Sequence, residues 1–330
     1  MASKTRFPAE RAGYEVLQPI GRSERGDSFR AKYSGGYVAL KIVDLELLGF
    51  KLEHLAKELL LMRCLCHKNV MTCFITFVEP YSHELIVVEP LMDLGDMHSI
   101  LRLHRKNGFE EPLLQIILQQ VLAGLSYFHH CNFVHRDVRA GTCLLDSSGV
   151  VKLSESRLTV ECLEHGNRRK KRQTFVGFPN WMAPEVVEQE GGYDARADIW
   201  SFGLAITELA TGKIPYEGLQ PLKVLKCILR GTPPKLTGDY SKNLLDLVDQ
   251  CLRRKPEERA SVSKLQEHPF FKGTKKCEVL AASLVGIPYI WDRVKIAPEE
   301  VHRPQNGSAE WDFDICKLDN LGEEEMAQPL

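Results

Sequence analysis

The chain has 330 residues, of which 44% are hydrophobic, and its formal net charge is -1 at pH 7. A chain of this length and apolar content can bury the core of one large domain or of two lobes. The near-zero charge gives no reason to expect nucleic acid or an anionic membrane as a partner. The polar start carries no apolar leader and no run is long enough to span a bilayer, so we expect a cytoplasmic or nuclear protein.

The first third of the chain carries short apolar runs that are typical of strands, together with one amphipathic helix. The helix is predicted over residues 48–65. The strands are predicted over residues 14–17, 28–31, 37–43, 71–77 and 84–88.

A glycine-bearing turn separates the first two predicted strands. Gly21 and Gly26 stand at its ends, and glycine at such positions lets backbone amides close over phosphate groups. Ser23 stands where a third glycine would complete the pattern. The turn alone is therefore a weak signal, and a plain hairpin turn is the alternative.

A lysine on the third strand and a glutamate on the helix form a second candidate feature. Lys41 ends the run Val-Ala-Leu-Lys, which resembles the kinase strand whose lysine binds the ATP phosphates. Glu58 lies on the predicted helix at a spacing that suits an ion pair with Lys41. Taken alone, Lys41 could equally be a solvated lysine on a sheet edge.

The run His135-Arg136-Asp137 opens a loop that resembles the catalytic loop of protein kinases. In that loop an aspartate accepts the proton of the substrate hydroxyl, and Asp137 takes its place. Arg139 replaces the usual lysine, while Thr142 and Glu155 replace the asparagine and aspartate that hold magnesium. Mg²⁺ needs oxygen ligands at short, fixed distances, so a neutral hydroxyl and a longer carboxylate predict weak or absent magnesium binding.

The following segment resembles the end of a kinase activation segment. Thr174 occupies the usual regulatory phosphosite, and Phe178 stands where the family has a threonine that hydrogen-bonds the catalytic aspartate. Phenylalanine cannot make that bond. We expect Asp198 to hold the backbone of the catalytic loop and Arg259 to pair with Glu185, and both contacts are structural rather than catalytic.

The rest of the chain carries apolar residues at helical spacing. Helices are predicted over residues 112–130, 198–211, 221–229 and 244–254.

Together these motifs resemble the sterile-twenty branch of protein kinases, of germinal-centre type, over residues 14–272. The resemblance implies an α+β, bilobal protein-kinase fold. Its N-lobe (14–89) would hold a five-stranded antiparallel sheet with one main helix, and its C-lobe (93–272) would be mostly helical. Residues 1–13 would be an N-terminal segment, and residues 273–330 a tail with short ordered pieces. The residues placed around ATP by this resemblance are Gly21, Gly26, Ala39, Lys41, Glu58 and Leu144.

Within that branch, the triplet Glu155-Ser156-Arg157, where kinases carry Asp-Phe-Gly, and the tail motif Trp311-Asp312-Phe313 resemble the STRAD pseudokinases. Those proteins lack phosphotransfer and bind an active serine/threonine kinase as a pseudosubstrate. Their aromatic motif binds a helical-repeat scaffold, calcium-binding protein thirty-nine, which implies the same role for Trp311 and Phe313. The chain departs from them because Asp137 is retained and because residues follow the aromatic motif.

Two functions stay open on the sequence. The favoured one is a pseudokinase, with ATP as a candidate ligand, that acts as an adaptor or allosteric activator of a partner serine/threonine kinase. The alternative is an active sterile-twenty-type serine/threonine kinase with unconventional metal binding, regulated by phosphorylation at Thr174.

Overall fold

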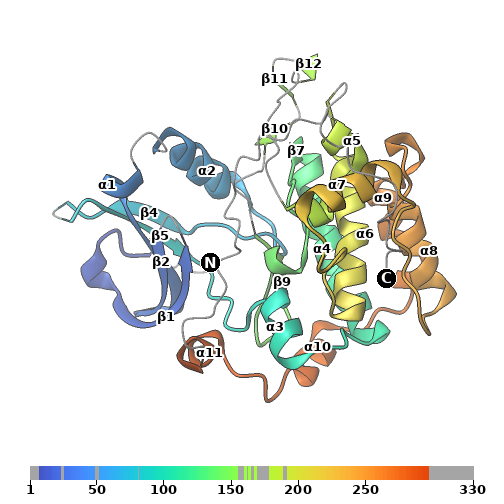
Figure 1. Cartoon of the computed structure of the whole chain (residues 1–330). Coiled ribbons are helices and arrows are strands. Elements are labelled where there is room, and N and C mark those ends of the chain that lie inside the picture. The colour runs from blue at the N-terminus through green and yellow to red at the C-terminus, as the bar shows by residue number, and fades with distance from the viewer. Residues whose placement is uncertain are drawn as a thin grey trace.

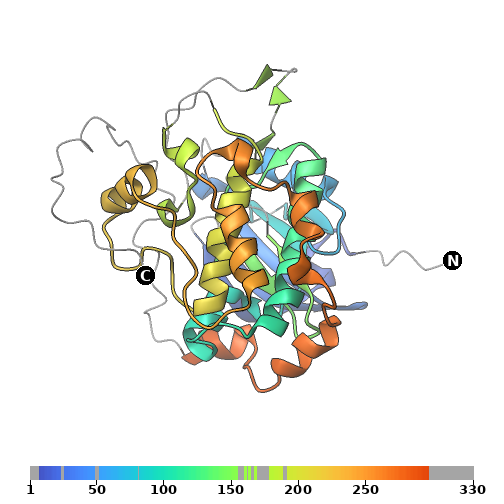
Figure 2. The same cartoon turned by 90° about the vertical axis from the view of Figure 1, so that its right-hand side faces the viewer.

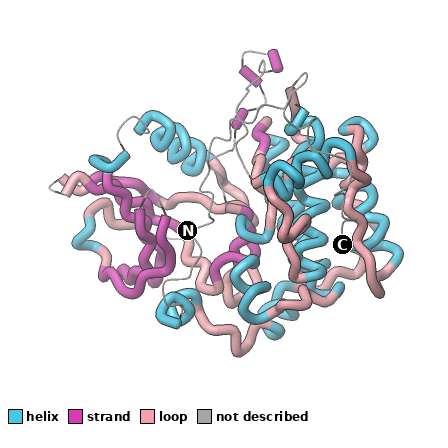
Figure 3. The backbone as a smooth tube through the Cα atoms, in the orientation of Figure 1, coloured by secondary structure: helices cyan, strands magenta, loops and turns pink. Residues whose placement is uncertain are grey.

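The computed structural model describes residues 7–23, 26–48, 52–80, 82–154, 160–161, 163–164, 167–168, 178–188 and 192–296. Figure 1 shows two lobes, a sheet-rich N-lobe in blue and a larger C-lobe. Figure 3 shows the same division by secondary structure, with strands gathered in one lobe and helices in the other. The predicted α+β, bilobal fold is confirmed.

The N-lobe is built on a five-stranded antiparallel sheet in the order β1-β2-β3-β5-β4. β1 extends to the tip of the glycine turn because it pairs with β2 as far as the pair Ser23 and Gly26. The strands are β1 (Glu15–Ser23), β2 (Gly26–Tyr33), β3 (Gly36–Asp44), β4 (Ile75–Val78) and β5 (Glu84–Glu89).

One face of this sheet is covered by a helix. The helix predicted over residues 48–65 corresponds to α2 (Leu52–Cys64), and a short helix, α1 (Leu45–Leu48), precedes it. Leu55 and Met62 of α2 pack with Val43 of β3 in one apolar cluster. The sheet and α2 therefore share a small core of their own.

The C-lobe is organised around α4 (Glu111–His130) and α6 (Arg196–Thr211). α6 is buried from Ala197 to Ala210, and Figure 2 shows it, in yellow, inside the helical layer. It ends at Gly212, whose φ of 73° is the left-handed conformation that glycine adopts readily at helix ends. The other helices of this lobe are α3 (Met97–His104), α5 (Pro184–Glu188), α7 (Pro221–Arg230), α8 (Lys242–Cys251) and α9 (Val262–Gln266).

The catalytic loop lies between two short strands of the C-lobe. β7 (Phe133–Val134) leads into it and β8 (Cys143–Leu145) leads out of it. β8 pairs with β6 (Gly95–Asp96), at the end of the hinge segment 90–95 that joins the two lobes, and with β9 (Val151–Leu153). β7 pairs with β10 (Val160–Glu161), so sheet pairing fixes the loop at both ends. Further two-residue strands are β11 (Leu163–Glu164) and β12 (Asn167–Arg168).

The start of the predicted tail is ordered. It forms α10 (Cys277–Ser283) and α11 (Ile290–Ile296). Leu280 of α10 and the following Leu284 are buried in the main C-lobe core, so the chain continues to pack on this lobe after residue 272. Among the described residues, no helix combines the length and the apolar character that crossing a bilayer requires.

Candidate catalytic site

The catalytic loop is anchored from behind by a buried carboxylate on α6. Asp198 accepts hydrogen bonds from the backbone N–H of His135 at 2.9 Å and of Arg136 at 2.7 Å. His129 Nε2 lies 2.8 Å from the same carboxylate. Arg136 has a φ of 68°, a conformation that residues other than glycine rarely adopt, and the bonds to Asp198 hold it there. The predicted role of Asp198 is confirmed.

These contacts also fix the charge of the anchor. Burial disfavours the ionised form of Asp198, but the hydrogen bond and charge of His129 and the backbone N–H of Arg136 outweigh it. The pKa of Asp198 therefore lies below its ordinary value. The loop is held by a carboxylate that is ionised at neutral pH.

His135 is fully buried behind the loop and is neutral. Its Nδ1 accepts from the N–H of Asp137 at 3.3 Å, and its Nε2 donates to the Ser154 carbonyl at 2.7 Å. Burial, only partly offset by Asp198 and the Ser154 carbonyl, lowers the pKa of His135. The imidazole therefore joins the catalytic loop to the end of β9 without carrying charge.

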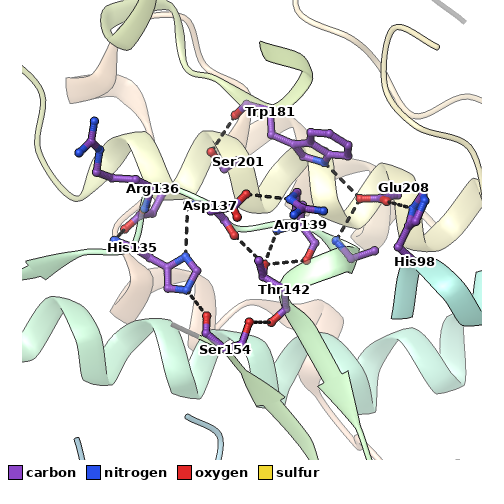
Figure 4. Close-up of polar contacts among 12 residues, drawn as sticks. His98, His135, Arg136, Asp137, Arg139, Thr142, Ser154, Trp181, Ser201 and Glu208 are labelled. Atoms are coloured by element: carbon purple, nitrogen blue, oxygen red, sulfur yellow. Dashed lines mark hydrogen bonds and ion pairs between the residues drawn. The ribbon is translucent and has the colours of Figure 1, made fainter. Parts of the chain in front are cut away.

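The Asp137 carboxylate is occupied by a neighbour in its own loop. Arg139 Nε donates to Asp137 Oδ1 at 2.8 Å, as Figure 4 shows. The guanidinium carbon of Arg139 also lies 3.9 Å from the centre of the Phe178 ring and 5.8 Å from that of Trp181. Phe178 therefore does more than remove a hydrogen bond, because its ring face holds Arg139 over Asp137.

The space for Arg139 exists because residue 141 is glycine. A Cβ atom on Gly141 would collide with Nη1 of Arg139 and would lie 3.0 Å from its guanidinium carbon. The missing side chain thus lets the guanidinium fold back along its own loop.

Thr142 uses its hydroxyl entirely within the loop. Its Oγ1 accepts from the N–H of Arg139 at 3.2 Å and lies 2.6 Å from the Asp137 carbonyl, to which it donates. The residue is 6% exposed. Asparagine has two polar atoms and can bond the backbone with one while offering the other to a metal, whereas threonine has one polar atom. In this structure that atom is already used.

A second buried carboxylate, Glu208 of α6, joins three elements around the loop. It accepts from the N–H of Ala140 at 3.0 Å and from the Trp181 indole at 3.2 Å, and it lies 3.1 Å from Nδ1 of His98. Arg259 makes the predicted pair with Glu185, with two parallel bonds of 2.6 and 2.7 Å. Both buried carboxylates of this frame are therefore paired.

The predicted nucleotide residues fall on the N-lobe sheet and on β8. Gly21 lies opposite Ser28, and Ser28 lies opposite Lys41, so all three share one face of the sheet. Ala39, Lys41 and Val43 lie at every second position of β3 and therefore share one face of the sheet. Val43 packs against α2, so this face is the one that α2 covers. Leu144 is half-buried on β8.

The backbone around Gly26 requires glycine for a structural reason. Its φ is 150°, and a Cβ atom there would collide with the Ile42 carbonyl of β3. Glycine is thus required by the close approach of β2 to β3, which favours the hairpin alternative for this residue and leaves its phosphate role a prediction.

Several predicted residues lie outside the described part of the structure. They are Glu155, Thr174, Trp311 and Phe313, together with the side chain of Glu58. Their roles stay predictions.

Sequence reasoning missed three side chains of this site. The sequence predicts no role for Glu208 or His129, and for Phe178 it predicts only the loss of a hydrogen bond to Asp137. Glu208 interrupts the apolar run Leu204-Ala-Ile-Thr, and a carboxylate in a buried helix signals a polar partner. No comparable signal marks the stacking of Phe178 on Arg139.

Comparisons with known proteins agree with this geometry. Residues 14–268 match the model of the protein tyrosine and serine/threonine kinase family. Serine/threonine-protein kinase fray2 of Dictyostelium discoideum is 37% identical over 303 residues, which cover 89% of this chain and 29% of that protein. Germinal center kinase 3 of Caenorhabditis elegans is 32% identical over 338 residues, covering 94% of this chain and 56% of that protein.

A shorter relative is matched along most of its length. Serine/threonine-protein kinase ppk11 of Schizosaccharomyces pombe is 36% identical over 294 residues, 88% of this chain and 91% of that protein. The chain thus spans less than two thirds of fray2 and germinal center kinase 3. It belongs to the protein tyrosine and serine/threonine kinase family, with relatives among serine/threonine kinases of the sterile-twenty, germinal-centre type.

Proposed function

We propose that this chain is a catalytically impaired protein kinase, a pseudokinase that acts as an adaptor and allosteric activator of a partner serine/threonine kinase. One observation carries the proposal. The two catalytic-loop groups that would serve phosphotransfer, the Asp137 carboxylate and the residue 142 side chain, are both bonded within the loop.

The contact on Asp137 competes directly with a substrate. A general base must lie within hydrogen-bond reach of the hydroxyl whose proton it accepts. Arg139 holds one carboxylate oxygen at 2.8 Å and is itself stacked on Phe178. A substrate hydroxyl would have to displace this arrangement or share it.

The contact at Thr142 weakens the magnesium site that the family normally uses. ATP bound between the lobes would supply the phosphoryl group, and Gly21, Ala39, Lys41 and Leu144 would hold it. Removal of one preorganised electrostatic contact lowers catalytic rates by about 10²- to 10³-fold. Losing both metal ligands, at Thr142 and Glu155, would leave little phosphotransfer.

The adaptor role follows from the resemblance to STRAD proteins. A kinase-like surface that does not turn over can bind an active serine/threonine kinase as a pseudosubstrate. The framework contacts of Asp198 and Arg259 support this role, because they keep the loop and the large lobe in kinase form.

Thermal-shift titrations with ATP, with and without magnesium, test the proposal. We expect a small or absent shift that magnesium does not increase, and no peptide phosphorylation above that of an Asp137→Ala variant. Turnover at an ordinary kinase rate that Asp137→Ala abolishes would refute the pseudokinase.

A gain-of-function variant tests the same point from the other side. Thr142→Asn combined with Glu155→Asp restores the residues that the family uses for magnesium. We expect ATP to raise the melting temperature of this variant more with magnesium than without it. An unchanged response would show that the missing ligands are not what limits nucleotide binding.

The tail supplies the proposed scaffold contact. Two aromatic side chains in a polar segment are typical binding anchors, and we propose that Trp311 and Phe313 bind a helical-repeat scaffold of the calcium-binding protein thirty-nine type. A Trp311→Ala, Phe313→Ala variant should lose binding to that scaffold in calorimetry, while the control Glu323→Gln should retain it. Equal affinity of the double variant and the wild type would exclude these anchors.

An active kinase is the second candidate function. It is favoured by the retained Asp137 and Lys41 and by relatives that are named as kinases. In that case phosphate at Thr174 would switch activity on, and a Thr174→Glu variant would phosphorylate a peptide faster than the wild type.

A further inference from the structure

The chain returns to the N-lobe after completing the C-lobe. Leu284 is buried in the C-lobe core, and α11 then packs against β1. Figure 1 shows α11 at the foot of the N-lobe sheet, far along the chain from the strands that it touches. One short segment therefore contacts both lobes.

The first set of contacts is to the hinge. The N–H of Ile290 donates to the Asp93 carbonyl at 2.9 Å, and the Arg293 guanidinium donates to the Leu94 carbonyl. A Cβ atom on Gly95 would lie 2.6 Å from Cδ1 of Ile290, so the hinge backbone fits closely against α11. The hinge is also fixed to the C-lobe, because the Asp93 carboxylate accepts from the N–H and Oγ of Ser147, both at 2.6 Å.

The second set of contacts is to the sheet. The guanidinium of Arg30, on β2, lies between the Trp291 ring at 4.3 Å and the Tyr37 ring of β3 at 4.2 Å. The Tyr289 ring stacks on the Trp291 ring, with ring centres 4.7 Å apart and an angle of 18° between the ring planes. Nη1 of Arg30 also lies 3.4 Å from the amide oxygen of Gln18 on β1. Trp291 of α11 thus contacts Arg30 of β2, which in turn contacts residues of β1 and β3.

Arg293 of α11 carries a buried charge. It is 8% exposed, and burying a guanidinium is costly unless it is well paired. Burial lowers its pKa, against the opposing charge of Asp96. Within the described residues, its Nε and Nη1 find no hydrogen-bond partner. A charged side chain is therefore retained here although its burial is incompletely compensated, while its one bond goes to the hinge.

We propose that α11 is an interlobe strut, in which Trp291 holds the β1–β3 strands and Arg293 holds the hinge. The strut sets how far the lobes open from a position outside the predicted nucleotide residues. Releasing it loosens β1 and β2 relative to the C-lobe and leaves the C-lobe core intact.

Hydrogen exchange of the full chain without nucleotide tests the strut, so the result does not depend on ATP binding or catalysis. Loss of a cation–π contact of this kind raises local opening by about tenfold. We therefore expect Trp291→Ala to accelerate exchange of β1 and β2 about tenfold, with α4 and α6 unchanged. Val285→Ala is the matched control, because that side chain lies in the segment leading to α11 and is 84% exposed.

A second variant keeps the test sharp if Trp291→Ala does not fold. Arg30→Gln removes the cation and leaves α11 intact, and it should accelerate the same strands. The two substitutions combined should accelerate exchange by less than the product of their separate effects, because both remove the contact between Arg30 and Trp291. Unchanged exchange in β1 and β2, or equal acceleration in α6, would overturn the strut.

Discussion

The two sides of the catalytic loop differ in how they treat their polar groups. On the side that faces α6, Asp198 and Glu208 hold the loop through backbone N–H groups and buried partners. On the opposite side, Asp137 and Thr142 bond to other parts of the loop itself. The first side holds the shape of a kinase, and on the second one oxygen of Asp137 and the Thr142 hydroxyl have partners within the loop. The contacts that hold the loop backbone are therefore separate from the contacts of the Asp137 and Thr142 side chains.

The largest predicted loss of stability comes from a substitution in the framework around the loop, at Arg259. Arg259→Met leaves Glu185, whose side chain is 13% exposed, without its cation. Breaking a buried ion pair costs about 3–5 kcal/mol, and we expect that loss in urea unfolding. Lys255→Ala is the control, because its pair with Glu258 is exposed and should change stability by less than about 1 kcal/mol. A loss for Arg259→Met as small as the control would contradict a framework role.

The next effect concerns the anchor itself and depends on pH. Because the pKa of Asp198 in the folded protein lies below its ordinary value of 3.8, its ionised form adds stability above that value. This stability is lost as pH falls through the folded-state pKa. Asp198→Asn should cost about 2–3 kcal/mol at neutral pH, and the gap to the wild type should narrow in acid. A gap that stays constant down to acid unfolding would rule out the ionised anchor.

A smaller loss of stability is expected from the contact between Phe178 and Arg139 on the opposite side of the loop. Phe178→Leu keeps the apolar bulk and removes the ring face under Arg139, so we expect a loss of about 1 kcal/mol. A double-mutant cycle with Arg139→Met should recover that amount as coupling energy. Additive effects of the two substitutions would mean that the stacking does not hold Arg139.

The smallest effect lies at the surface, far from both sides. The hydrogen bond from His268, helped by Gln250 and opposed by slight burial, holds the pKa of Asp246 below its ordinary 3.8. Asp246 is 57% exposed, so solvent screening limits its contribution to less than about 1 kcal/mol. Asp246→Asn should lower the melting temperature at pH 6 and not at acid pH, where the carboxylate is protonated. The same difference at both pH values would contradict the assignment.

The sequence predicted the frame better than the chemistry of the loop. The predicted strands and helices correspond to elements of the structure, and the contacts of Asp198 and Arg259 were expected by residue, because apolar periodicity and family motifs specify them. The packing of Phe178 on Arg139 depends on a contact between residues that are distant in sequence, and no local pattern encodes it. The same holds for Trp291 and Arg30, whose segments the sequence assigned to a tail and a sheet.

Gly141 makes the state of the loop sensitive to a very small change in volume. A Cβ atom at residue 141 would collide with Nη1 of Arg139, so a single methyl group there would force the guanidinium to shift. Gly141→Ala would therefore disturb the position of Arg139 beside Asp137 without altering any charged residue. The contact between Arg139 and Asp137 therefore depends on the absence of a side chain at residue 141.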